Sequence, residues 1–153
     1  MRWFKNKYMI QRIQSIFLLI AGAGFFSLFK FPFAKSSEVT APLFEDQLFT
    51  IQDNPILLGL CILGGIISMA AIFLYKNRIL QKRIALVGII AALFVGGFAF
   101  YLMMSEGKDI PSNIEVSDQA GLFMPAVSLI MLILSNVYIN KDEKLVRSAD
   151  RLR

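Results

Sequence analysis

Residues 84–105 read IALVGIIAALFVGGFAFYLMMS, which is 22 consecutive positions without a charged side chain. A helix rises about 1.5 Å per residue, so roughly 20 residues cross the ~30 Å hydrocarbon core of a bilayer. The stretch therefore predicts a transmembrane helix. Three further uncharged stretches of the same kind lie at residues 13–29, 54–75 and 119–140.

The composition agrees with membrane residence, since 56% of the residues are hydrophobic and 18% are charged. In lipid every backbone amide must be paired within the protein, which leaves helices or a closed barrel. Barrel strands alternate apolar and polar residues, whereas residues 56–67 form a continuous apolar run. We expect an all-α membrane protein with one domain over 1–153, an antiparallel bundle of four transmembrane helices at about 10–30, 55–75, 84–104 and 121–140.

Basic residues precede the first apolar stretch, as they do in a signal peptide. The stretch is longer than the usual apolar part of a signal peptide, and no A-x-A pattern follows it around residues 32–36. We therefore expect it to stay in the protein as a membrane helix.

The charges outside the spans alternate in sign along the chain. Residues 1–12, 76–83 and 141–153 hold 13 of the 16 lysines and arginines, whereas residues 30–53 and 106–118 hold three, with eight acids. Positively charged loops stay in the cytoplasm. We expect both termini in the cytoplasm, the acidic loops outside, and localisation in the bacterial cytoplasmic (inner) membrane. The net charge of +5 then needs no nucleic-acid partner, because anionic lipid headgroups meet the basic side.

The loops and one proline give local expectations. Residues 39–42 and 47–51 flank an acidic turn and predict a small outer hairpin. The second loop, about eight residues at 76–83, makes the second and third helices antiparallel neighbours. Pro125 is favourable only in a first helical turn, so the fourth helix begins near residues 122–125 or kinks there.

The tail, residues 141–153, predicts an amphipathic cytoplasmic helix. Leu145, Val146, Ala149 and Leu152 fall on one helical face, with charged residues elsewhere. One interpretation is a helix that lies on the inner leaflet and anchors the fourth span. The other is a docking element for a cytoplasmic partner.

The spans offer little for catalysis. They contain no Asp, Glu, Lys or Arg, the chain has no histidine, and the lone cysteine, Cys61, is typical of a small packing residue. No nucleophile with a base, carboxylate pair, phosphate loop or metal-ligand spacing is present. We expect no enzyme activity, no cofactor and no metal.

Small residues form a stripe in the third span, where Gly88, Ala92 and Gly96 recur every four positions. Another helix backbone can approach closely along such a stripe. The partner is either a helix of the same bundle or another subunit.

A polar cluster lies at the cytoplasmic mouth of the first span, where Gln11 and Gln14 share a helical face beside Arg12. We hypothesise that Arg12 pairs with Asp142, Glu143 or Asp150 of the tail, the alternative being that it extends to lipid headgroups. The candidate interaction residues are Gln11, Arg12, Gln14, Asp142, Arg147, Asp150 and Arg151.

The two ends of the chain carry recognisable motifs. MIQRIQS at residues 9–15 and KDEKLVRSADRLR at residues 141–153 resemble a domain-of-unknown-function family of small bacterial inner-membrane proteins. The resemblance covers the chain from Met9 onward, since members commonly start at the equivalent methionine. It implies four helices and a membrane location, and it supplies no activity.

Together these patterns favour a non-catalytic inner-membrane protein that acts as an accessory or scaffolding component of a larger membrane assembly. Its partners would be the lipid bilayer and other membrane-protein subunits. The alternative is a small transporter or channel for a neutral or lipid-like solute, which needs a pore lined by polar side chains and carbonyls.

Overall fold

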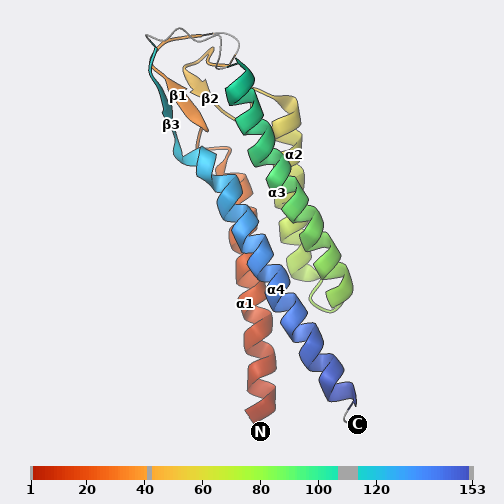
Figure 1. The fold of residues 1–153 in the computed structure, drawn as a ribbon. Helices are drawn as coiled ribbons and strands as arrows, with labels where there is room; N and C mark the ends of the chain where they lie inside the picture. The colour runs from red at the N-terminus through yellow and green to blue at the C-terminus, as the bar shows by residue number, and fades with distance from the viewer. Residues whose placement is uncertain (1, 41–42, 107–113, 152–153) are drawn as a thin grey trace.

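Four long helices and a small sheet make up the protein (Figure 1). The computed structural model describes residues 2–40, 43–106 and 114–151, with side chains for 13–40, 43–106, 114–144 and Ser148. The helices pack as an elongated bundle, and the sheet covers the end opposite the two termini. Their bounds are α1 Arg2–Ser27, α2 Pro55–Phe73, α3 Arg78–Glu106 and α4 Met124–Arg151.

Three segments are long and apolar enough to cross a membrane: Pro55–Phe73, Arg78–Glu106 and Ala120–Lys144. The described apolar part of α1, Ile13–Ser27, is shorter. Large apolar side chains also lie exposed along the sides of the bundle, among them Leu93 and Phe94 of α3. A soluble protein rarely exposes so much apolar surface, whereas a bilayer solvates it.

The turn between α2 and α3 is shorter than the sequence predicted, because α3 begins at Arg78 rather than at 84. Only residues 74–77 connect the two helices, which run antiparallel side by side. The Asn77 side chain explains the early start, since its Oδ1 accepts a hydrogen bond from the Leu80 amide (3.1 Å) and caps the first turn. At the other end of this hairpin, Asn54 caps α2 in the same way and Pro55 occupies its first turn.

The fourth helix has no break at residue 140. A short 3-10 helix, η2 (Ala120–Phe123), leads into α4 at Met124, so Pro125 lies in the first turn as expected. From there α4 runs without interruption to Arg151. The expected tail helix is therefore the continuation of the fourth span rather than a separate element, and α1 likewise begins at Arg2 rather than near 10.

The buried residues of each helix recur at alternating steps of three and four. This spacing places one seam of each helix on the bundle axis and is typical of left-handed helix bundles. In α3 the seam consists mainly of small residues, which let neighbouring helices approach closely. Its members are Gln81, Ala85, Gly88, Ala92, Val95, Ala99 and Leu102.

Three short strands form a sheet in the order β2-β1-β3, with both pairs antiparallel. The strands are β1 Ala34–Ser36, β2 Leu48–Phe49 and β3 Val116–Asp118. The expected hairpin is wrong in its pairing: residues 48–49 pair with 34–35, and the described part of 39–42 makes only the bridge Thr40–Phe44. Burial explains the choice, because pairing with β1 brings Phe33 and Phe49 into contact, 5.2 Å between ring centroids.

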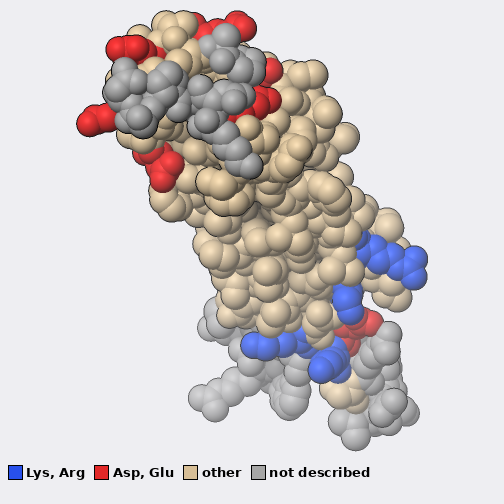
Figure 2. Space-filling model, turned by 45° about the horizontal axis from the view of Figure 1, so that its top comes forward, with Lys and Arg blue, Asp and Glu red and all other residues tan. Residues whose placement is uncertain are grey.

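The sheet joins the two acidic loops at one end of the bundle, since β1 and β2 come from the first and β3 from the other. Figure 2 shows acidic side chains gathered at this end and lysines and arginines toward the opposite end. We call these the acidic end and the basic end.

Two adjacent glycines in α2 give a first prediction. An added Cβ at Gly64 would lie 2.6 Å from the Phe25 ring, and one at Gly65 would lie 2.7 Å from the Phe26 ring. Phe25 is fully buried, whereas Phe26 is 40% exposed and can swing toward lipid. We expect Gly64→Ala to lower the free energy of unfolding by about 1–3 kcal/mol.

The matched variant Gly65→Ala should change it by less than about 0.5 kcal/mol. Thermal unfolding of both purified variants in the same detergent measures the difference. Equal losses would show that the exposure of the ring does not decide the outcome.

Candidate functional site

An ion pair joins the start of α3 to α4 at the basic end. Arg78 Nε lies 3.0 Å from Asp142 Oδ2, and the Asp142 side chain is 2% exposed against 17% for Arg78. The contact lacks the geometry of a directed hydrogen bond, so charge attraction carries it. Arg78 is the first residue of α3 and Asp142 lies on the axis-facing seam of α4. The pair therefore fastens the α2–α3 hairpin to α4.

Two buried glutamines lie on the axis-facing seams above the ion pair. Gln81 Nε2 donates to the Ala71 carbonyl oxygen (2.9 Å), which lies in the last turn of α2. Gln14 is contacted by α4 through its backbone, because Ser135 Oγ donates to the Gln14 carbonyl oxygen (3.4 Å). Both glutamine side chains are fully buried.

The helix registers place these groups in successive layers. Ser128 bonds Ala21 and Ser135 bonds Gln14, which sets α1 against α4. Gly88 packs on Leu132 and Arg78 meets Asp142, which sets α3 against α4. Antiparallel helices in this register bring Gln14 level with Ser135, then Gln81, then the ion pair nearest the end. We call Gln14, Arg78, Gln81, Ser135 and Asp142 the basic-end polar cluster.

The structure brings two of the candidate interaction residues, Gln14 and Asp142, into this cluster. Among the described side chains, the partner of Asp142 is Arg78. The proposed pairing of Arg12 with Asp142, Glu143 or Asp150 stays a prediction. The side chains of Gln11, Arg12, Arg147, Asp150 and Arg151 lie outside the described residues.

Sequence reasoning missed Arg78 and Gln81, because both were assigned to a loop. A signal was present: Arg78 and Gln81 precede Ala85 and Gly88 by the same steps of three and four that continue through the span. Extending that pattern backward would have placed both residues on the axis-facing seam of α3.

The small-residue stripe of α3 packs within the chain. A Cβ at Gly88 would lie 3.2 Å from Leu132, and one at Gly96 would lie 3.3 Å from Pro125, while Ala92 between them is buried. Both glycine contacts are with residues of α4. Of the two partners considered from the sequence, the helix of the same bundle occupies the stripe.

Two further polar contacts of the described helices are a thiol hydrogen bond and a cation beside an aromatic ring. No three His, Cys, Asp or Glu residues gather as they would around a metal ion within the described part of the chain. The Cys61 thiol donates to the Phe25 carbonyl oxygen (3.0 Å), which ties α2 to α1. Just outside the polar cluster, the Tyr138 ring contacts the Phe17 ring in a tilted arrangement, and the Lys141 ammonium lies 5.1 Å from the centroid of the Tyr138 ring.

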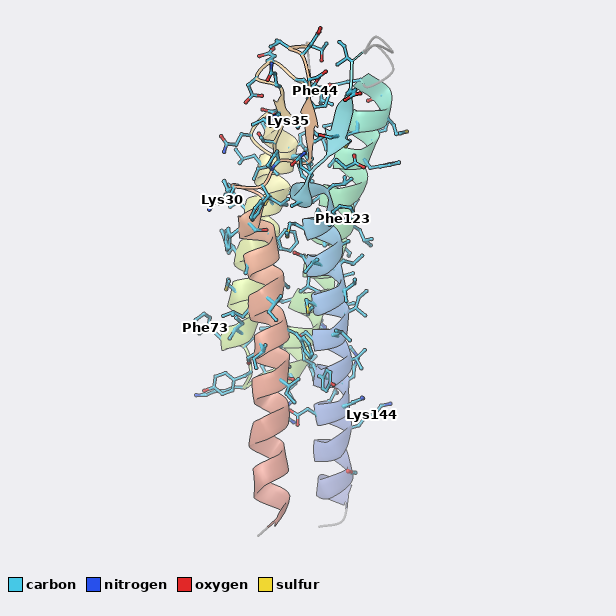
Figure 3. The ribbon with its side chains drawn as sticks, turned by 90° about the vertical axis from the view of Figure 1, so that its left-hand side faces the viewer. Lys30, Lys35, Phe44, Phe73, Phe123 and Lys144 are labelled. Atoms are coloured by element: carbon cyan, nitrogen blue, oxygen red, sulfur yellow. The ribbon has the colours of Figure 1, made fainter. Side chains whose placement is uncertain are left out.

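The helices α1 and α4 continue past this site. Figure 3 shows Phe73, the last residue of α2, well short of the ends of α1 and α4, with Lys144 beyond it. The α2–α3 turn meets α4 near Asp142, whereas α4 ends at Arg151 and α1 begins at Arg2. The basic end therefore carries two projecting helix ends.

Comparison with protein families matches residues 10–152 to the family described as "Domain of unknown function (DUF4293)". The chain belongs to this family. The match covers α2, α3 and α4 in full and α1 from residue 10, and it includes the polar cluster. Comparisons with curated proteins and with solved structures gave no match.

Proposed function

We propose that this protein is a non-catalytic, four-span component of the bacterial cytoplasmic membrane, which acts as an accessory or scaffolding subunit of a larger membrane assembly. The observation that carries the proposal is the pair of projecting helix ends. A helix that continues straight out of the bundle supports a docking element better than a helix lying on the leaflet. Its charged face then meets a cytoplasmic partner.

The proposed orientation rests on charge. Lysine and arginine gather at the basic end, and the sheet holds both acidic loops at the other end. Under the positive-inside rule the basic end and both termini lie in the cytoplasm. The four helix directions agree with this, since an even number of crossings returns the chain to its starting side.

Cysteine labelling in intact cells tests the orientation. In a Cys61→Ala background, we expect a membrane-impermeant maleimide to label Ser117→Cys of β3 in intact cells. It should label Ser148→Cys of α4 only after the membrane is permeabilised. Both positions are exposed, so accessibility to water alone does not separate them. Labelling of Ser148→Cys in sealed cells would reverse the proposed orientation.

Two truncations test the docking role. Mild-detergent affinity purification with mass spectrometry should recover specific membrane-protein partners with the full chain and lose them when the chain stops after Lys144. That truncation removes the projecting end and keeps the Arg78–Asp142 pair. Truncation after Asn140 removes both.

The two truncations separate docking from folding. Loss of partners only after the Asn140 truncation would assign the effect to bundle stability. Recovery of no specific partner with the full chain would remove the support for an accessory role.

The alternative, a small transporter or channel for a neutral or lipid-like solute, draws support from the buried amides Gln14 and Gln81. Tight apolar layers lie between them and the acidic end. They include the contacts of Gly88 with Leu132 and of Gly64 with Phe25. A conducting path would have to separate these helices, so we favour the accessory role.

A further inference from the structure

Polar atoms of two glutamines in the basic-end cluster are buried and have no hydrogen-bond partner among the described residues. They are Nε2 and Oε1 of Gln14 and Oε1 of Gln81, whereas Asp142 Oδ2 faces Arg78 in the ion pair. Gln14 and Gln81 are both 0% exposed. Most buried polar groups in proteins are paired, so several unpaired atoms gathered at one end of a bundle call for an explanation.

These atoms disfavour the closed arrangement. An unpaired buried donor or acceptor loses its hydration and gains nothing in return. A movement that admits water to Gln14 and Gln81 recovers that loss, and the apolar layers above, at Leu18 and Leu132, would stay packed. Within the described helices the unpaired amide atoms lie in the layers nearest the basic end, and the other such atom, Thr40 Oγ1, lies in the first loop at the acidic end.

The Arg78–Asp142 pair is placed to oppose this movement. It lies in the outermost layer of the cluster and joins α3 to α4, between Gln81 and the end of the bundle. At the basic end the turn at 74–77 joins α2 to α3, and no loop joins this hairpin to α1 or α4 there. The hairpin can therefore move away from α1 and α4 as a unit.

We propose that the basic end of the bundle opens into a polar crevice that takes water and small uncharged hydrogen-bonding solutes, with the Arg78–Asp142 ion pair as its latch. Water reaches Gln81 first and Gln14 next, and the crevice ends at Leu18 and Leu132. The crevice goes beyond the accessory role and stands without it, since it depends only on groups within the bundle.

Thiol reactivity of the folded protein in detergent tests the crevice. In the Cys61→Ala background, a water-soluble maleimide should modify Gln81→Cys at least about tenfold faster than Leu132→Cys, which is equally buried in the next layers. Adding Asp142→Asn should raise the rate at Gln81→Cys about tenfold further, which corresponds to ~1.4 kcal/mol in the opening equilibrium. The rate at Leu132→Cys should not change.

A second variant acts in the opposite direction. Gln14→Leu removes two unpaired atoms from the closed state, so it should slow modification of Gln81→Cys and raise the melting temperature. Equal rates at Gln81→Cys and Leu132→Cys would overturn the crevice. Equal acceleration of both by Asp142→Asn would overturn the latch by assigning the reactivity to global unfolding. An unchanged rate at Gln81→Cys after Gln14→Leu would overturn the opening argued from the unpaired amides.

Discussion

Gly121→Ala should be among the most damaging single-methyl changes in the described chain. A Cβ at this position would collide with the carbonyl oxygens of Phe31 and Pro32 and lie 2.6 Å from the Pro32 carbonyl carbon. These are backbone atoms, and the Gly121 amide also donates to the Pro32 carbonyl oxygen (3.0 Å). Neither of the two backbone segments can move aside as a side chain would.

We expect Gly121→Ala to lower the free energy of unfolding by about 3 kcal/mol or more, at the upper end for overpacking. The contact fixes η2 against the segment that follows α1, so its loss should also release β3 from β1. Denaturant titration of the purified protein in detergent measures this loss of unfolding free energy. Proteolysis of the loop between α1 and α2 should accelerate in parallel.

Gly97→Ala is the matched control. Apart from its chain neighbours and the nearby backbone of α3, no described atom lies within 4 Å of the position of its Cβ, and Gly97 is exposed. Alanine is favoured over glycine in a helix interior, so we expect a gain of about 0.5–1 kcal/mol. A Gly121→Ala protein that melts with the wild type would show that the two backbone segments separate without consequence for the bundle.

The helices could be predicted from the sequence because their signal is local. Uncharged runs of about 20 residues and the N-terminal preference of Pro125 need no knowledge of distant contacts. The sheet could not be predicted. Its pairing depends on Phe33 and Phe49 burying each other across the first loop, and on β3 arriving from a loop 80 residues further along the chain.

Only part of the polar cluster could be predicted from the sequence. Gln14 and Asp142 lie beside apolar runs and could be chosen as candidates from the sequence. Arg78 and Gln81 were assigned to a loop, because the predicted span ended at the first charged residue. Long helices continue past the hydrocarbon and carry their seam with them. Helix ends near charged residues are therefore better located by seam spacing and caps, such as Asn77, than by charge alone.

The second large effect concerns the latch, and it should be asymmetric. Arg78→Met leaves the Asp142 carboxylate, 2% exposed, without its partner. A buried charge that loses its partner typically costs about 3–5 kcal/mol of unfolding free energy. Asp142→Leu leaves the Arg78 guanidinium, 17% exposed, which reaches water or headgroups by extending its long side chain.

We therefore expect Arg78→Met to lower the unfolding free energy by about 3 kcal/mol or more, and Asp142→Leu by about 1 kcal/mol. The double variant Arg78→Met/Asp142→Leu should recover most of the loss, because an apolar pair of similar volume needs no desolvation of charge. Denaturant titration of the four proteins completes a double-mutant cycle. Additive losses of unfolding free energy would mean that the two side chains do not interact. Equal losses from the two single variants would mean that burial does not decide which charge depends on its partner.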